Sequence, residues 1–381
     1  MPKRFFAPGH FIRLVHSGKP YFEELGRLID SAGQTIYLLV YIFDEDETGK
    51  LVLHHLEKAA SRGVEIYFIA DGYGSASLSS NFGERMIKSG INFKFFSPVS
   101  IFKTINSGRR LHQKVCVADG KKALVGGINI SDKYRGTKSA KPWFDLALYI
   151  EGPLCTDLHV MCKNIWEKQY RNKKTGVLHQ HLRSGGVMAR MVQNDWLRRK
   201  NEISSSYKKK LQAASSKIVI AASYFLPSRR FLNILLRAAK KGRNISIILS
   251  RDSDVPFIKP AIAYLYNRML SAGIRIFEYD QSVLHAKAVM VDNRWVSIGS
   301  HNLNHLSEYI SMELNIEVLD KHFGTLFNHE MELLIKNHCQ EVTLDSYEKT
   351  NNKFKKLSQW FSYKLVSMSE RILDMFTRRI K

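Results

Sequence analysis

The stretch HQKVCVADGKKALVGGIN at residues 112–129 is matched by HAKAVMVDNRWVSIGSHN at residues 285–302. Both copies follow the pattern His-x-Lys-x4-Asp-x6-Gly-(Gly or Ser)-x-Asn. Every matched residue of the second copy lies the same number of positions after its counterpart in the first. At average residue usage, these positions would coincide by chance roughly once in several million starting points. The duplication predicts two copies of one structural unit.

Apolar strand-like runs alternate with helix-like runs around the first copy. Strands are predicted at residues 36–43, 65–70, 92–96, 114–118, 123–125 and 146–151, with helices at 21–32, 51–62 and 81–89. The second copy repeats this order, with strands at 218–222, 245–250, 275–279, 287–291, 296–298 and 314–318, and helices at 230–241 and 261–272. This alternation is typical of βαβ units around a parallel sheet.

The predicted fold class is therefore α/β. We expect two related βα lobes, each with a mixed, largely parallel sheet flanked by helices, and an amphipathic C-terminal helix. The predicted divisions are a first lobe at 1–170, a basic connector at 171–210, a second lobe at 211–340 and a tail at 341–381.

The two copies offer the same set of polar side chains. A His and a Lys two residues apart on a strand project from one face, and the Asn follows a Gly-rich turn that permits close backbone approach. These groups donate hydrogen bonds without adding negative charge, which suits a phosphate. The donors are His112, Lys114 and Asn129 in the first copy and His285, Lys287 and Asn302 in the second.

This donor set predicts chemistry at a phosphodiester. One neutral His can attack phosphorus while the other, protonated, donates to the departing oxygen. The lysines and asparagines would hold the non-bridging oxygens in the transition state. Asp119 and Asp292 lie where a strand meets a turn, so a structural role and direct catalytic contact both stay open.

The duplicated motif resembles the HKD motifs of the phospholipase D superfamily, over about residues 10–335. The resemblance implies two lobes that build one active site, a covalent phosphohistidine and no metal or other cofactor. It also implies that His112 is the nucleophile and His285 the general acid/base, although the reverse assignment is chemically almost as good. By the same resemblance, an acidic residue downstream of each motif orients a histidine, for which Asp145 and Glu313 are the candidates.

Within the superfamily, the sequence is most similar to bacterial cardiolipin synthases of the short type without transmembrane helices. The similarity rests on YIFD at 41–44, DGYGS at 71–75, GGIN at 126–129 and SYFLP at 223–227. It implies transfer of a phosphatidyl group to the hydroxyl of a second phospholipid, phosphatidylglycerol by expectation, with release of glycerol.

The charge distribution indicates an anionic partner. The net charge is +23, and two segments carry most of it: residues 171–210 hold eleven basic and two acidic residues, and residues 351–381 hold eight and two. The first segment is interpreted equally well as a solvated linker or an anion-binding surface. In the tail, Phe354, Leu357, Phe361, Leu365 and Met368 recur at helical spacing, which predicts a basic amphipathic helix that contacts a membrane or packs on the core.

The longest apolar run, at 36–43, is far below the ~20 residues that span a bilayer. Four cysteines without paired spacing favour a reducing compartment. We therefore expect a peripheral enzyme on the cytoplasmic side of the cell membrane. Its partners would be an anionic phospholipid surface and phospholipid substrates, with no obligatory protein partner.

Three other functions stay open. A hydrolase that releases phosphatidic acid would use the same motif chemistry with water as acceptor. A nuclease of the same superfamily would suit the charge, but basic residues do not alternate regularly with aromatic ones as in a base-stacking groove, so nucleic acid is the less favoured partner. A membrane-binding pseudo-enzyme conflicts with two intact motifs.

Overall fold

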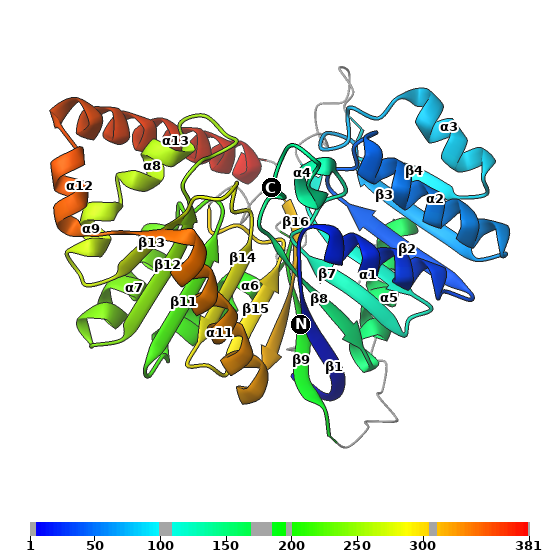
Figure 1. Ribbon diagram of the computed structural model, residues 1–381, viewed down its shortest axis with the longest axis horizontal. Coiled ribbons are helices and arrows are strands. Elements are labelled where there is room, and N and C mark those ends of the chain that lie inside the picture. The colour runs from blue at the N-terminus through cyan, green and yellow to red at the C-terminus, as the bar shows by residue number, and fades with distance from the viewer. Residues whose placement is uncertain (1–4, 99–108, 169–184, 196–199, 305–310, 380–381) are drawn as a thin grey trace. The chain divides into compact units, whose positions relative to one another are not determined.

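The computed structural model describes residues 5–98, 109–168, 185–195, 200–304 and 311–379 (Figure 1). The chain forms two compact units, which we call lobe 1 and lobe 2. Lobe 1 comprises Met1–Gln193, Ile298–Ser300 and Met312–Asp320, and lobe 2 comprises Asn194–Ser297, His301–Ser311 and Lys321–Lys381. A short segment that follows the second motif thus belongs to the lobe that carries the first.

Lobe 1 is built on a mixed sheet in which neighbouring strands follow the order β4-β3-β2-β6-β7-β8-β1. The pairs β2–β3 and β3–β4 are parallel, and the remaining pairs of this series are antiparallel. The strands are β1 (Ala7–His16), β2 (Thr35–Val40), β3 (Glu65–Asp71), β4 (Asn92–Phe96), β5 (Arg110–Leu111), β6 (Lys114–Ala118), β7 (Lys122–Gly126), β8 (Leu146–Glu151) and most of β9 (Val187–Asp195) and β16 (Ser311–Leu319).

Helices cover both faces of this sheet, as the alternation of side chains along β2 requires. Ile36, Leu38 and Val40 pack into one core cluster with α1 and α2, while the Tyr37 ring meets His159 of α5 on the other face. The helices are α1 (Lys19–Asp30), α2 (Glu47–Ser61), α3 (Ser80–Lys88), α4 (Asp132–Arg135) and α5 (Pro153–Trp166).

Lobe 2 repeats the central pairing. Strands β11, β12 and β13 are parallel neighbours, as β2, β3 and β4 are, and β14 lies antiparallel to β11, as β6 does to β2. The strands are β10 (Lys200–Asn201), β11 (Lys217–Ala222), β12 (Asn244–Ser250), β13 (Arg275–Tyr279), β14 (Lys287–Val291), the start of β15 (Trp295–Gly299) and β17 (Cys339–Val342).

The helices of lobe 2 are α6 (Glu202–Gln212), α7 (Arg229–Lys240), α8 (Ile258–Ala263), α9 (Tyr266–Leu270), α11 (Lys321–His338), α12 (Leu344–Thr350) and α13 (Lys353–Arg379). Helix α13 packs along α8 (Figure 1). The predicted fold class, with related α/β lobes and a C-terminal helix, is confirmed.

Part of the predicted basic connector is core structure. Strand β9 and most of helix α6 lie within residues 171–210, and Met191 and Tyr207 are buried there. Arg190 forms an ion pair with the buried Glu317, with 2.7 Å between Nη2 and Oε2. Residues 169–184 and 196–199 lie outside the described part, and the predicted domain boundaries stay predictions.

The aspartates of the two motifs hold turns. Asp119 accepts hydrogen bonds from the backbone N–H groups of residues 33–35, which lead into β2. Asp292 accepts from the N–H groups of residues 215–217, which lead into β11. Burial raises the pKa of Asp292, but these donors outweigh it and lower the pKa to about 2. Each carboxylate therefore fastens the start of a central strand.

We predict that Asp292→Asn lowers the free energy of unfolding of lobe 2 by roughly 1–2 kcal/mol near neutral pH, because an amide accepts the same N–H groups more weakly. A carboxyl with a lowered pKa contributes fully above its ordinary value of 3.8, and the contribution is lost as the pH falls towards 2. Urea denaturation should show a deficit in the free energy of unfolding of Asp292→Asn that is constant from pH 7 to about pH 4. Between about pH 4 and pH 3 the deficit should become smaller.

The control is Asp252→Asn, at an exposed carboxylate of the same lobe. A deficit in Asp292→Asn that does not change over this pH range would contradict the prediction.

Candidate active site

The His112 side chain is oriented by a carboxylate from a distant part of the sequence. Its Nδ1 lies 2.9 Å from Oε1 and 3.0 Å from Oε2 of Glu313 on β16. The backbone N–H of His112 also donates to the carbonyl of Met312, at 3.1 Å. Glu313 is buried and accepts a second hydrogen bond from the Ser300 hydroxyl. A carboxylate on Nδ1 fixes the proton there and directs Nε2 away from it.

The predicted pairing of acids with histidines thus has an unexpected form. Glu313 lies downstream of the second motif, yet it contacts the histidine of the first. Ser300, also from the second motif, completes the same cluster within lobe 1. His112 therefore depends on residues about 200 positions further along the chain.

The Lys114 ammonium lies beside His112. It donates to the His112 carbonyl at 2.7 Å and lies 5.1 Å from the centre of the Tyr41 ring. That ring meets the His112 imidazole edge-on, with 4.9 Å between centroids. Burial, followed by the nearby Asp71, raises the pKa of Tyr41 to about 12, so its hydroxyl is neutral at physiological pH. The aromatic ring restricts both motif side chains.

In the second motif the lysine contacts the imidazole itself. Lys287 Nζ lies 2.7 Å from His285 Nδ1 and also donates to the His285 carbonyl. It also lies 3.2 Å from His285 Nε2, so the lysine is within reach of both ring nitrogens. Tyr224 meets His285 edge-on at 6.2 Å. The contacts of Lys287 therefore hold the His285 ring without selecting one tautomer, whereas Glu313 fixes the tautomer of His112.

The two asparagines differ in their surroundings. Asn129 accepts from the Ile42 N–H at 3.1 Å and donates to the Tyr134 hydroxyl at 2.8 Å, which ties the motif to the segment after β2. Asn302 is buried, and its Oδ1 accepts no hydrogen bond from the described residues. Among the described residues, Asn129 is thus held by the fold through both ends of its amide, whereas the Asn302 oxygen is not.

Asp145 is the positional counterpart of Glu313. It is fully buried, its Oδ1 accepts from the Leu146 N–H at 2.7 Å, and a Cβ on Gly127 would come within 2.4 Å of that oxygen. Gly127 occupies the motif position of Ser300, so each acid lies against the equivalent residue of a motif. The close approach explains why this position is Gly in the first copy.

Asp119 and Asp292 lie at the far end of their strands from the lysines. Each is five residues beyond its motif lysine, which at the rise of a strand is roughly 16 Å. The described contacts of both carboxylates are with the turns already named. The structure does not bring them to the histidines.

A polar residue that the sequence analysis did not single out anchors each motif histidine. At the end of β3, the buried Asp71 accepts the N–H of Leu111 at 2.7 Å, directly before His112. At the end of β12, the Ser250 hydroxyl accepts the N–H of Leu284 at 2.9 Å, directly before His285. Both lie at the C-terminal ends of parallel strands, and that position was the available signal.

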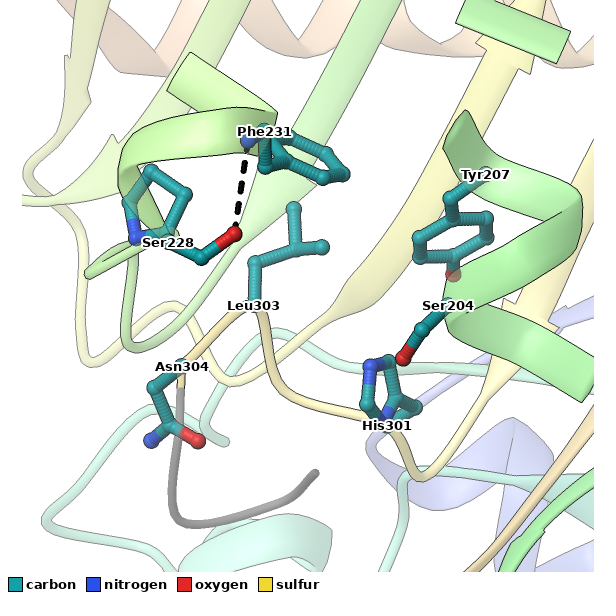
Figure 2. A pocket seen from close by; sticks show the side chains of 8 residues that line it. Ser204, Tyr207, Ser228, Phe231, His301, Leu303 and Asn304 are labelled. Carbon is teal, nitrogen blue, oxygen red and sulfur yellow. Dashed lines mark hydrogen bonds between the residues drawn. The ribbon is translucent and has the colours of Figure 1, made fainter. Parts of the chain in front are cut away.

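His301, which follows the second motif serine, lies in a packing site. Figure 2 shows its ring next to Ser204 and Tyr207 of α6, in a small pocket of lobe 2 that Phe231 of α7 also lines. The centroids of the His301 and Tyr207 rings are 6.0 Å apart. His301 therefore packs against α6 within lobe 2.

The described residues contain no group of three or more His, Cys, Asp or Glu side chains suited to a metal ion. In the same residues, no helix combines the length and the apolar character needed to cross a membrane.

Comparison with known proteins agrees with the motif. The family model described as "Cardiolipin synthase, PLD-like domain" matches residues 25–140 and 207–336. Cardiolipin synthase B of Escherichia coli (strain K12) is 30% identical over 346 residues, which cover 88% of this chain and 82% of that protein. Cardiolipin synthase of Staphylococcus aureus (strain N315) is 26% identical over 370 residues, covering 94% and 72%.

Among solved structures, phosphatidylserine synthase of Haemophilus influenzae Rd KW20 aligns with a TM-score of 0.75 over 98% of this chain and 97% of that one. Polyphosphate kinase from Porphyromonas gingivalis aligns with a TM-score of 0.62 over 95% and 53%. Sequence identity is 16% in both cases, so these similarities establish the fold.

Two α/β lobes that each carry a His-x-Lys motif define an enzyme of the phospholipase D superfamily. Within it, the chain belongs to the family of cardiolipin synthase, PLD-like domains, and is an enzyme of the type that transfers phosphatidyl groups. The resemblance and the enzyme class predicted from the sequence are confirmed.

We predict that Asp71→Ala lowers the free energy of unfolding of lobe 1 by about 3 kcal/mol, whereas Ser250→Ala costs lobe 2 about 1 kcal/mol. Asp71 is a buried charged acceptor for three backbone N–H groups, those of Leu111, Tyr73 and Gly74, while Ser250 is a neutral acceptor for one. Urea denaturation measures both effects.

Glu84→Ala, at an exposed residue of α3, is the control and should change little. Equal losses for Asp71→Ala and Ser250→Ala would show that the carboxylate does not anchor the strand more strongly than the hydroxyl.

Proposed function

We propose that this protein synthesises cardiolipin from two phosphatidylglycerol molecules and releases glycerol. The observation that carries the proposal is the His112–Glu313 hydrogen bond, which holds the first motif histidine in the tautomer needed for attack on phosphorus. The substrate class follows from the relatives named cardiolipin synthase, which this chain matches over most of their length. Both motifs would serve one active site.

The reaction has two transfers at one phosphorus. First, the Nε2 lone pair of His112 forms a bond to phosphorus, and the bond between phosphorus and the glycerol headgroup oxygen breaks. His285, as the imidazolium with both ring nitrogens protonated, donates its Nε2 proton to that oxygen, so glycerol leaves neutral and His285 becomes a neutral base. Next, the hydroxyl of a second phosphatidylglycerol attacks phosphorus, His285 takes its proton, and the P–N bond to His112 breaks.

The contact between His112 and Glu313 supports this division of roles. His112 has its proton on Nδ1, which leaves Nε2 as the nucleophile. Asp145, the counterpart of Glu313 against the first motif, is proposed to orient His285.

The remaining motif residues are proposed to bind phosphate. Lys114 and Lys287 would stabilise the charge on the non-bridging oxygens, and Asn302 would donate from its amide. Asn129 would contribute through the one amide hydrogen that Tyr134 does not accept. We propose that Asp119 and Asp292 support the site only through the turns they hold. No metal or other cofactor enters the proposal.

We further propose that the enzyme binds peripherally to the cytoplasmic face of the cell membrane. An anionic phospholipid surface would attract its excess of 58 basic over 35 acidic residues, at about 1 kcal/mol for each Lys or Arg held near the surface. No protein partner is required, because both motifs are on one chain.

The product assay tests the proposed reaction. Phosphatidylglycerol vesicles incubated with the full chain should yield cardiolipin and glycerol in equal amounts, measured by lipid mass spectrometry and a glycerol assay. Phosphatidic acid as the only lipid product would replace the synthase with a hydrolase. Cleavage of single-stranded DNA without turnover of any lipid would overturn both lipid reactions.

The covalent step gives a second prediction. His112→Ala should abolish turnover and the acid-labile phosphohistidine, because no other group in the proposal forms the P–N bond. Glu313→Gln should keep the fold but lower kcat by on the order of 10²–10⁴-fold, since an amide no longer fixes the tautomer. Rapid-quench labelling with radioactive phosphatidylglycerol measures the adduct and kcat together.

His54→Ala, at an exposed histidine of α2, is the matched control and should retain full activity. If the adduct persists in His112→Ala and disappears in His285→Ala, the nucleophile and the acid are exchanged.

A further inference from the structure

Helix α13 packs on lobe 2 through its polar side. Gln359 exchanges two hydrogen bonds with Asn351, at 3.0 and 3.1 Å, and accepts a third from the Tyr347 hydroxyl. Ser362, one turn further on, is 2% exposed. Tyr363 stacks on Tyr264 at the end of α8, with 4.7 Å between ring centroids. These contacts fix which face of the helix is turned towards the protein.

The apolar side of the same helix is turned outward. Phe354 is 84% exposed, Leu357 61% and Phe361 57%. With Leu365 and Met368, which are also exposed, these residues recur at steps of three and four and form one stripe along the helix. We call these five residues the outer stripe. An ordinary surface helix would bury such a stripe and expose Gln359 and Ser362, so the amphipathic pattern of α13 is inverted with respect to its own protein.

Basic and interfacial side chains accompany the outer stripe. Lys353, Lys356 and Lys364 are all exposed. Lys364 Nζ lies 5.8 Å from the ring centre of Trp360, itself 43% exposed, and Trp is the residue that membrane–water interfaces favour. Helix α8, on which α13 packs, begins directly after Phe257, a further exposed aromatic residue.

We infer that the outer stripe is a docking surface for an anionic phospholipid bilayer, with α13 lying in the plane of the interface. Apolar side chains inserted between lipids together with lysines at the phosphates are the composition of an interfacial helix. A second copy of this chain fits less well, because pairing of two outer stripes would bring the exposed lysines of both copies together. Lipid phosphates would neutralise them instead.

The inference rests on the proposed lipid substrate. It adds that helix α13 binds the enzyme to the bilayer that contains this substrate. The contacts that hold α13, at Gln359, Ser362 and Tyr363, lie on its opposite side. Docking therefore requires neither unfolding of the helix nor its release from α8.

The test is a double variant of the full chain, Phe361→Gln with Leu365→Gln. Gln is a good helix former, and both side chains are exposed, so circular dichroism should show unchanged helicity. Co-sedimentation with phosphatidylglycerol vesicles should show binding at least about tenfold weaker than that of the unmodified chain. The matched control is Ile87→Gln, at an exposed apolar residue of α3 in lobe 1, which should bind as the unmodified chain does.

Charge is tested separately. Substitution of Lys353, Lys356 and Lys364 by Gln should weaken binding to phosphatidylglycerol vesicles and make that binding less sensitive to salt. Binding to phosphatidylcholine vesicles should be unchanged. Equal loss on both kinds of vesicle would overturn the part assigned to anionic lipid.

Two outcomes overturn the inference as a whole. One is vesicle binding unchanged in the Phe361→Gln, Leu365→Gln variant. The other is a fall in oligomeric state by analytical ultracentrifugation with unchanged vesicle binding, which would make a second copy the occupant. The proposed reaction is measured independently: stripe-dependent vesicle binding by a chain that makes no cardiolipin would keep the docking surface and reject the synthase.

Discussion

The buried carboxylate of Glu313 is the constraint on which the site in lobe 1 depends. A buried carboxylate is strongly destabilising unless it accepts hydrogen bonds, and the donors to Glu313 include Nδ1 of His112 and the hydroxyl of Ser300. Both donors must therefore be in place when the lobe folds. The backbone bond from His112 to Met312 sets the position of β16 in the same step. The same segment of β16 therefore orients the histidine through its side chain and pairs with it through its backbone.

The two motifs have the same pattern but different supports. The residue before His112 is held by a buried carboxylate, Asp71, and the residue before His285 by a neutral hydroxyl, Ser250. The His112 imidazole lies against a carboxylate, and the His285 imidazole lies against an ammonium. Duplication supplies two equal histidines, whereas a reaction that needs a nucleophile and an acid requires unequal ones. The differences lie in the groups around the motifs, which is where a duplicated site can diverge without losing its pattern.

Much of the fold could be predicted because its signals are local. Alternating apolar runs separated by turns predicted most central strands of both lobes to within one residue at each end, although β2 ends at Val40 and not at Phe43 as predicted. Helix α5 was missed, although Pro153 at its first turn and buried residues at helical spacing were available signals. The partnership of Glu313 with His112 could not be predicted in the same way, because it depends on where β16 lies in three dimensions. The separation of Asp119 from the histidine could have been predicted, because Asp119 lies five residues beyond Lys114 and the rise of a strand separates the two by roughly 16 Å.

For the C-terminal helix, the sequence pattern predicted an apolar face but not what that face contacts. Its periodicity showed that one face is apolar, and this left contact with a membrane and packing on the core equally open. The two interpretations differ in which face of the helix packs on the protein. The polar face does, because Gln359 and Ser362 are held against lobe 2 while Phe354 and Phe361 are exposed. A hydrophobic core would have taken the opposite face, since burial of those rings would stabilise the fold by more than the polar contacts do. This open apolar face, with lysines beside it, is the basis on which we propose an anionic bilayer as its partner.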